Sequence, residues 1–157
     1  MNKYAAIAVL CSFAALPAWA ADSPKDKLIG AWRLLEIRER DSETGAEKPA
    51  TPASAGGQLI YTANGRLSLQ IARVGWEKVL PGGPGGFASY FGTWEVVPAE
   101  GYVIHHQDGN LSPAQVGQAA KRYYSFDAQG HLSLATPPAR NAAGRNVATV
   151  FVWERFP

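Results

Sequence analysis

Apolar and polar residues alternate along much of the chain from residue 28 onward. In the first such stretch, Leu35 and Ile37 are interleaved with Glu36 and Arg38. Successive side chains of a strand point to opposite faces of a sheet, so a period of two is typical of half-buried β-strands. Because apolar residues with helical spacing are nearly absent, the pattern predicts an all-β fold.

The alternation predicts eight strands, and short turn sequences separate several of them. The strands are expected over residues 28–40, 58–63, 66–72, 89–97, 102–107, 121–126, 131–136 and 146–156. Asn64-Gly65 accepts the positive φ angles of a type I′ turn, which predicts a tight hairpin between the second and third strands. Residues 98–101 and 127–130 are expected to turn two further hairpins. Loops are expected over 41–57, 74–87 and 108–117, the last with a short helical turn after Pro113.

Consecutive hairpins favour one architecture among those that eight strands allow. Eight antiparallel strands close into an up-and-down barrel whose interior fits side chains or one small ligand. Closure also removes exposed sheet edges, where other chains could pair. A two-sheet sandwich is the alternative, but strands linked mainly to their sequence neighbours favour the barrel.

The first residues have the pattern of a secretory signal peptide. Lys3 provides a positive start, an apolar stretch covers 5–16, and Ala18-Trp19-Ala20 offers small residues at the cleavage positions. The apolar run is shorter than the about 20 residues that span a bilayer. Lipid attachment at Cys11 is a further alternative, although bulky Leu10 precedes it. We expect cleavage after Ala20, and a periplasmic or secreted mature protein.

Composition narrows the classes of partner. The only cysteine lies in the signal segment, so the mature chain has no disulfide and no thiolate metal site. The net charge is +2 and no long charged run occurs, so neither nucleic acid nor anionic membrane is an expected partner. We expect no transmembrane segment in the mature chain, a tail over 21–26 and one barrel domain over 27–157.

The chain resembles the bacterial and fungal lipocalin-like domain family, whose members are calycin-type barrels. The resemblance lies in runs from Gly30-Ala31-Trp32-Arg33-Leu34, Leu59 to Ser68, Tyr90 to Val96, His105-His106, Leu111-Ser112-Pro113, Leu132 to Pro138 and Val152 to Arg155. It implies a small hydrophobic ligand inside the barrel. It also implies that Trp32, after Gly30, closes one barrel end with Arg155 packed on its indole. Residues 81–86 and Gln115 depart from the family pattern, which implies a more open mouth.

Several aromatic and amide side chains are candidate ligand contacts. Tyr61, Tyr90, Trp94 and Tyr124 offer rigid surface with a polar group for orientation, although for any single aromatic residue ordinary core packing is the more common explanation. Gln70 shares a strand face with Ser68, and this face is outside the barrel unless a ligand-holding interior reverses the usual order.

A histidine pair and an arginine are the candidates for polar recognition. His105 and His106 are adjacent on a strand, so at most one faces the interior and they cannot chelate one metal ion together. The inward imidazole would contact a ligand or act as an acid or base. The alternative is a structural histidine bonded to a tyrosine or an aspartate, with the other histidine on the surface. Arg122 shares a face with Tyr124. If that face is inward, its guanidinium could grip a carboxylate; if outward, it stacks on an aromatic ring or pairs with Glu95.

Three functions remain open at this point. Known nucleophile, zinc, phosphate and dinucleotide motifs are absent from the sequence, so we expect no metal and no cofactor. The leading hypothesis is a non-enzymatic protein that binds a small hydrophobic molecule. The alternative is an isomerase, cyclase or hydrolase that uses a barrel histidine. A third is a cell-envelope interaction protein with an aromatic patch around Trp76 and Phe87.

Overall fold

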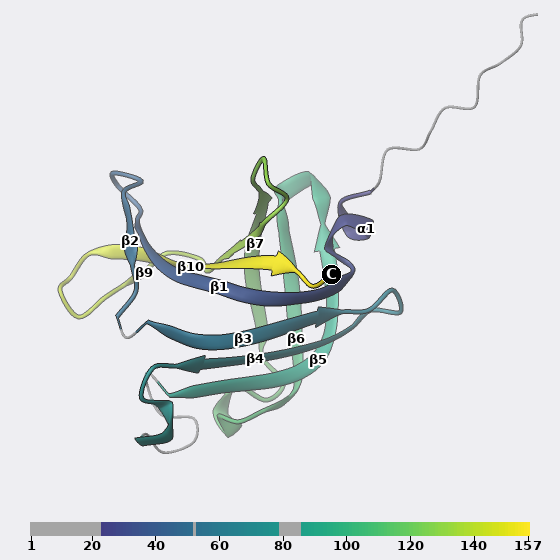
Figure 1. Cartoon of the computed structure of the whole chain (residues 1–157), viewed down its shortest axis with the longest axis horizontal. Coiled ribbons are helices and arrows are strands. Elements are labelled where there is room, and N and C mark those ends of the chain that lie inside the picture. The colour runs from purple at the N-terminus through teal and green to yellow at the C-terminus, as the bar shows by residue number, and fades with distance from the viewer. Residues whose placement is uncertain (1–22, 52, 79–85) are drawn as a thin grey trace, which may run out of the picture.

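Eight antiparallel strands close into a barrel in the computed structural model, which describes residues 23–51, 53–78 and 86–157 (Figure 1). The strands are β1 (Gly30–Asp41), β3 (Ser54–Tyr61), β4 (Arg66–Arg73), β5 (Phe87–Val97), β6 (Tyr102–Asn110), β7 (Ala119–Phe126), β8 (Leu132–Ala135) and β10 (Asn146–Arg155). Each pairs with the next, and β10 pairs back on β1. The predicted all-β barrel is therefore confirmed. The predicted signal segment, 1–20, lies outside the described residues.

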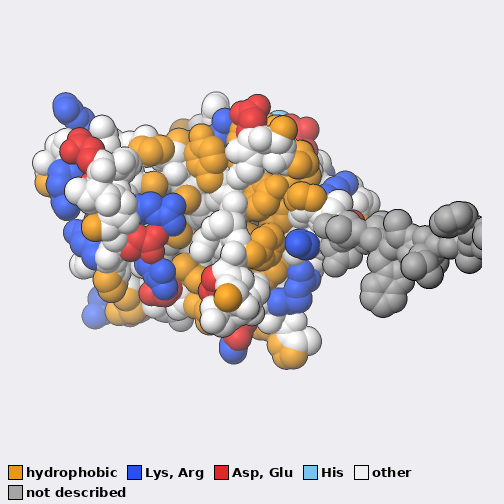
Figure 2. All heavy atoms as spheres, turned by 90° about the horizontal axis from the view of Figure 1, so that it is seen from above, with side chains coloured by type: hydrophobic (Ala, Val, Ile, Leu, Met, Phe, Trp, Pro, Cys, Tyr) orange, Lys and Arg blue, Asp and Glu red, His pale blue; other side chains and the backbone are white. Residues whose placement is uncertain are grey.

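Two short strands that the sequence pattern did not predict extend the sheet at one end. β2 (Glu47–Pro49) pairs with β1, and β9 (Ala139–Arg140) pairs with β10. Their three and two residues are too few to show an alternation. Glu47 accepts bonds from Arg38 at 3.0 Å and from Arg40 at 2.7 Å. Side chains of both charges crowd this end, at the left of Figure 2.

The hairpin between β3 and β4 exists, but its turn differs from the expected type I′ turn. Gly65 has φ of 81°, whereas Asn64 has a negative φ. The amide of Gly65 donates to the carbonyl of Thr62 at 3.1 Å, and the amide of Thr62 donates to Arg66 at 2.9 Å. This is a three-residue loop with a glycine in the left-handed region at its end. The Asn-Gly dipeptide therefore marks the hairpin, but not its turn type.

A bulge in β1 decides which of its side chains face the barrel interior. The pairing with β10 shifts between Leu34 and Glu36. One extra residue reverses the alternation, so Leu34 and Ile37 are both buried while Glu36 pairs with Arg38 outside. Glu36 therefore lies outside the barrel, and Leu35, which the alternation placed on the same face as Ile37, is exposed.

A short helix, α1 (Pro24–Leu28), precedes β1, where the sequence pattern predicted a tail and the start of a strand. Ser23 and Asp26 form a reciprocal capping box that fixes its first turn. Leu28 is fully buried in the barrel core. One apolar residue in five gives no helical period, so capping and burial hold α1 in place rather than amphipathic patterning.

Trp32 and Arg155 lie at the end of the barrel next to α1. The indole Nε1 of Trp32 donates to the carbonyl of Leu28 at 2.9 Å. Arg155 spreads over the outer face of that indole and donates to the carbonyls of Ile29 at 2.6 Å and Lys27 at 2.7 Å. The chain end and α1 are side by side here (Figure 1). The loops after β1, β4, β6 and β8 lie at the opposite, open end.

Smaller expectations also have clear outcomes. A 3₁₀ turn at Pro113–Gln115 confirms the short helical turn after Pro113. Another, at Trp76–Lys78, lies in the predicted 74–87 loop, of which 79–85 are outside the described part. No helix within 23–51, 53–78 or 86–157 is long and apolar enough to cross a membrane.

Candidate functional site

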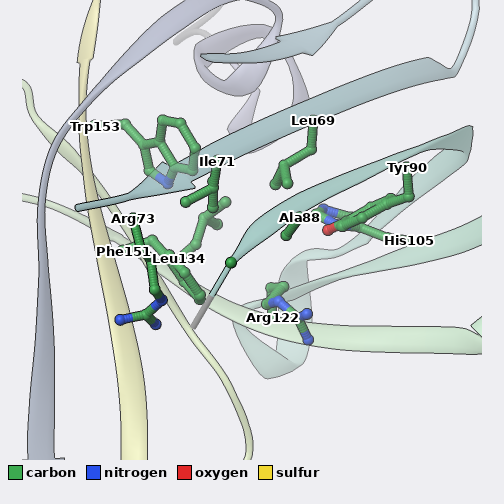
Figure 3. Close-up of a pocket in the computed structure, with 11 residues that line it drawn as sticks. Leu69, Ile71, Arg73, Ala88, Tyr90, His105, Arg122, Leu134, Phe151 and Trp153 are labelled. Carbon is green, nitrogen blue, oxygen red and sulfur yellow. The ribbon is translucent and has the colours of Figure 1, made fainter. Parts of the chain in front are cut away.

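A cavity of about 160 Å³ lies inside the barrel, between the closed end and the loops of the open end (Figure 3). Its apolar wall comes from β4, β8 and β10, and consists of Leu69, Ile71, Leu134, Phe151 and Trp153. Its polar side comes from Tyr90 on β5, His105 on β6 and Arg122 on β7, with Arg73 at the end of β4. An apolar pocket with a few convergent polar groups is the usual form of a small-molecule site.

His105 is held between two tyrosines at the polar side of this cavity. Its Nε2 is 2.5 Å from the hydroxyl of Tyr61, and its Nδ1 is 2.8 Å from the hydroxyl of Tyr90. The imidazole and Tyr61 are buried almost completely. Both ring nitrogens are therefore satisfied by hydroxyl groups. His105 and Tyr90 line the cavity, whereas Tyr61 does not.

Burial keeps all three of these groups uncharged at neutral pH. Burial, together with the smaller effects of the nearby Arg122 and His106, lowers the pKa of His105 from 6.5 to about 3. Burial raises the pKa values of Tyr61 and Tyr90, against the opposing charge of Arg122. The site therefore combines neutral hydrogen-bonding groups with the positive charge of a guanidinium.

The hydrogen bonds assign a direction to this chain of groups. A neutral imidazole has one donor and one acceptor nitrogen. Among the described residues, the hydroxyl of Tyr61 has His105 as its one hydrogen-bond partner, so its buried proton is donated to Nε2. Nδ1 then carries the imidazole proton and donates to Tyr90. As a result, the proton of the Tyr90 hydroxyl is left for an acceptor in the cavity.

Arg122 faces the barrel interior, so the inward alternative of the sequence stands. It pairs across the sheet with the buried Val103, and both point to the same side. Its Nη1 donates to the carbonyl of Lys121 at 2.8 Å. No acidic side chain of the described residues forms an ion pair with it. Figure 3 places its guanidinium below Tyr90 and His105, at the cavity edge.

Arg73 provides a second positive charge on the other side of the cavity. Burial lowers its pKa, and the nearby carboxylate of Glu39 opposes this effect. In Figure 3 it lies beside Phe151, away from Arg122. The alternation of β4 could have indicated it, because it continues the inward series of Leu69 and Ile71.

Tyr61 and Trp94 lie in the core behind the cavity rather than in its wall. Their rings are tilted by 37° with centroids 4.4 Å apart, and the indole of Trp94 donates to the carbonyl of Thr62 at 3.2 Å. Tyr124 faces inward but lies toward the closed end, where its ring is 6.5 Å from that of Phe126. These predicted contacts support the site without lining it.

Two of the predicted contacts lie outside the barrel. Gln70 bonds to Gln58 at 2.9 Å and to Ser68 at 2.8 Å on the outer face, because the leucines of β4 occupy the interior. The side chain of His106 points to the face of β6 opposite that of His105. Its Nε2 is 3.2 Å from a carboxylate oxygen of Glu95, in solvent. The expectation that either of them contacts a ligand in the barrel is corrected.

Trp153 is the main cavity residue that sequence reasoning missed. It is 0% exposed, and its indole nitrogen is the one buried side-chain polar atom without a partner among the described residues. It shares an inward face with Phe151 and Arg155 on β10, so the period of two could have placed it in the interior. Its missing hydrogen bond, however, is a property of the assembled barrel.

The aromatic pair considered for an interaction surface is also close in space. The rings of Trp76 and Phe87 have centroids 5.3 Å apart, and Trp76 is partly exposed. The pair lies at the open end and outside the cavity wall. Most of the Gly/Pro-rich segment between them is outside the described residues.

Comparison with known families agrees with the fold. The sequence model of the lipocalin-like domain matches residues 85–156, which span β5 to β10. This segment contains Tyr90, His105, Arg122 and Trp153, while Leu69 to Arg73 precede it. The predicted resemblance to this family is therefore confirmed over that part of the chain. No curated protein sequence matches the chain.

Proposed function

Because the chain carries a lipocalin-like domain, we propose that it binds a small, mainly apolar molecule inside the barrel. The observation that carries this proposal is the cavity itself, with an apolar wall on one side and Tyr90, His105 and Arg122 on the other. The wall would remove the apolar body of a ligand from water, and the polar side would orient it.

The cavity volume limits the size of that molecule. An apolar protein cavity of about 150 Å³ holds one benzene ring. The volume of about 160 Å³ therefore favours a ligand with a single ring or a short branched chain. A long-chain lipid would need a larger cavity. The aromatic side chains of Phe151 and Trp153 favour a flat ring, because such rings pack against one another with specific geometry.

We also propose that the protein is exported and acts in the periplasm or outside the cell. The support is the charged start, apolar run and small residues of the first 20 positions. Protein recovered from the medium or periplasm of exporting cells should begin at Ala21 on N-terminal sequencing. Retention of residues 1–20, or a lipid on Cys11, would contradict this part of the proposal.

A matched pair of variants tests binding in the cavity. Ala88 lines the cavity and Ser89, the next residue of β5, points outward. Ala88→Phe should fill the cavity, whereas Ser89→Phe adds the same side chain outside. We expect benzyl alcohol, benzoate or indole to shift NMR resonances of the wild type and of Ser89→Phe, but not of Ala88→Phe. Absence of binding to the wild type, or equal binding to Ala88→Phe, would reject the proposal.

An enzyme is the second candidate, because His105 lies within hydrogen-bond reach of two tyrosines beside the cavity. Tyr90 and Arg122 could stabilise a developing oxyanion in an isomerase, cyclase or hydrolase reaction. The chain of hydrogen bonds from Tyr61 through His105 to Tyr90 forms a proton relay. However, complete transfer of a proton through this relay would leave a charged, buried Tyr61, and burial raises the pKa of this tyrosine. This cost is why we favour binding. Turnover of any carbonyl substrate that Tyr90→Phe abolishes, with binding retained, would reverse this preference.

A further inference from the structure

The cavity contains a buried hydrogen-bond donor that lacks an acceptor. The indole nitrogen of Trp153 is completely buried, and none of the described residues accepts a bond from it. Buried polar groups in folded proteins are nearly always bonded, so each exception calls for an explanation. In Figure 3 this nitrogen lies on the side of the ring toward the other cavity residues. Because this nitrogen has no surface open to the cavity, the side chains around it must shift slightly before a ligand atom in the cavity can supply the missing acceptor.

The opposite side of the cavity presents donors and a positive charge. The relay from Tyr61 through His105 leaves the hydroxyl proton of Tyr90 directed to an outside acceptor. Arg122 adds a guanidinium next to it, and the described lining residues include no carboxylate. A guanidinium and a hydroxyl together match the two oxygens of a carboxylate. A neutral ligand would leave the charge of Arg122 without a counter-ion in the site.

We propose that the ligand is a compact aromatic carboxylate with a second oxygen, a hydroxyl or carbonyl group, elsewhere on the ring. Its carboxylate would bind Arg122 and the hydroxyl of Tyr90, and its second oxygen would accept the bond from Trp153. The ring would lie against Phe151 and Leu134. This inference rests on the proposed function and adds the chemical class of the molecule.

The size and charge of the site disfavour two neighbouring classes. A fatty acid has the carboxylate but not the compact body that about 160 Å³ accommodates. A neutral aromatic compound has the body but gives Arg122 no counter-ion. A simple benzoate satisfies Arg122 and Tyr90, but it leaves the indole of Trp153 without an acceptor. The three donors together therefore favour a hydroxybenzoate-like molecule.

A series of probes of nearly equal size tests the proposal. The probes are benzyl alcohol, benzoate and the three hydroxybenzoate isomers, titrated by calorimetry into the mature protein. We expect benzoate to bind more tightly than benzyl alcohol, and one hydroxybenzoate isomer to bind more tightly than benzoate. Arg122→Met should weaken the binding of carboxylates at least tenfold and leave benzyl alcohol unchanged. Arg140→Met, an exposed arginine on β9, is the matched control and should change nothing.

The contact with Trp153 has its own readout. The indole Nε1–H resonance of the wild type should shift with the favoured hydroxybenzoate isomer and not with benzoate. Trp153→Phe should make that isomer bind no better than benzoate. If this variant fails to fold, the shift of the indole resonance in the wild type still tests the contact. If no isomer moves the resonance, the second contact is wrong. If benzyl alcohol binds as well as the carboxylates, the ligand class is wrong while cavity binding stands. If no probe binds, the proposed function itself fails.

Discussion

The guanidinium carbon of Arg155 lies 4.3 Å from the centre of the Trp32 ring, at the barrel end farthest from the open loops. The two residues belong to the last and first long strands, β10 and β1, which close the barrel by pairing with each other. The contact therefore joins the chain ends, and the carbonyls that Arg155 also binds belong to α1 and the residue after it.

Arg155→Ala should lower the free energy of unfolding by about 1 to 2 kcal/mol. The variant loses a cation–π contact and two charge-assisted hydrogen bonds, and solvent exposure reduces the value of each. Urea unfolding at neutral pH measures the change. Arg145→Ala is the control, because this exposed arginine is 4.0 Å from Asp41 and such pairs contribute little. Equal effects of the two substitutions would show that the Arg155 contact has no special role.

Gly30→Ala should also destabilise the closed end. Gly30 has φ of 141°, and a Cβ atom there would collide with Nη1 of Arg155. We expect a loss of about 1 to 3 kcal/mol from the backbone conformation and the collision together. In the Arg155→Ala background the loss should be smaller, because the collision is gone and only the backbone cost remains. Additive effects of the two substitutions in urea unfolding would contradict this coupling.

The alternation of residues predicted the barrel because most of its strands have one apolar and one polar face. On β4, Leu69 and Ile71 alternate with polar side chains, and the barrel buries the apolar set. On β6, by contrast, His105 follows three residues that are apolar or aromatic. Both faces of β6 therefore carry apolar or aromatic residues before the histidines, so the alternation could not show which histidine lies inside.

The bulge in β1 and the cavity could not be predicted for different reasons. The extra residue after Leu34 reverses the alternation, and no local sequence feature marks it, so Glu36 could be assigned to either face. The missing partner of Trp153 depends on the side chains that surround it only after the barrel closes. Sequence reasoning identified Tyr61, Tyr90 and His105 separately, but the hydrogen bonds that join them required the register of the strands.

The buried histidine should make the protein less stable in mild acid. Burial lowers the folded-state pKa of His105 to about 3, whereas in the unfolded chain it is near 6.5. Between these values the unfolded state binds a proton that the folded state does not. The free energy of unfolding therefore has its full value, as far as His105 is concerned, above pH 6.5 and falls as the pH decreases. The slope is at most about 1.4 kcal/mol per pH unit.

Urea unfolding between pH 7 and pH 5 measures this loss. His105→Gln should show a shallower slope, and His106→Gln, which changes an exposed histidine, should behave like the wild type. An NMR titration of the imidazole gives an independent readout, in which His105 should stay neutral throughout this range. Protonation of His105 near pH 6.5 would contradict the prediction.

Tyr61→Phe should cost more stability than Tyr90→Phe, because the two hydroxyls differ in their access to water. Without the Tyr61 hydroxyl, Nε2 of His105 loses its donor in a fully buried place, at a cost of about 1 to 3 kcal/mol. Tyr90 lines the cavity, so water can replace its hydroxyl next to Nδ1. Urea unfolding of both variants measures the difference. The ¹⁵N shifts of His105 should place the wild-type proton on Nδ1, and a proton on Nε2 would mean that the relay runs in the opposite direction, away from the cavity.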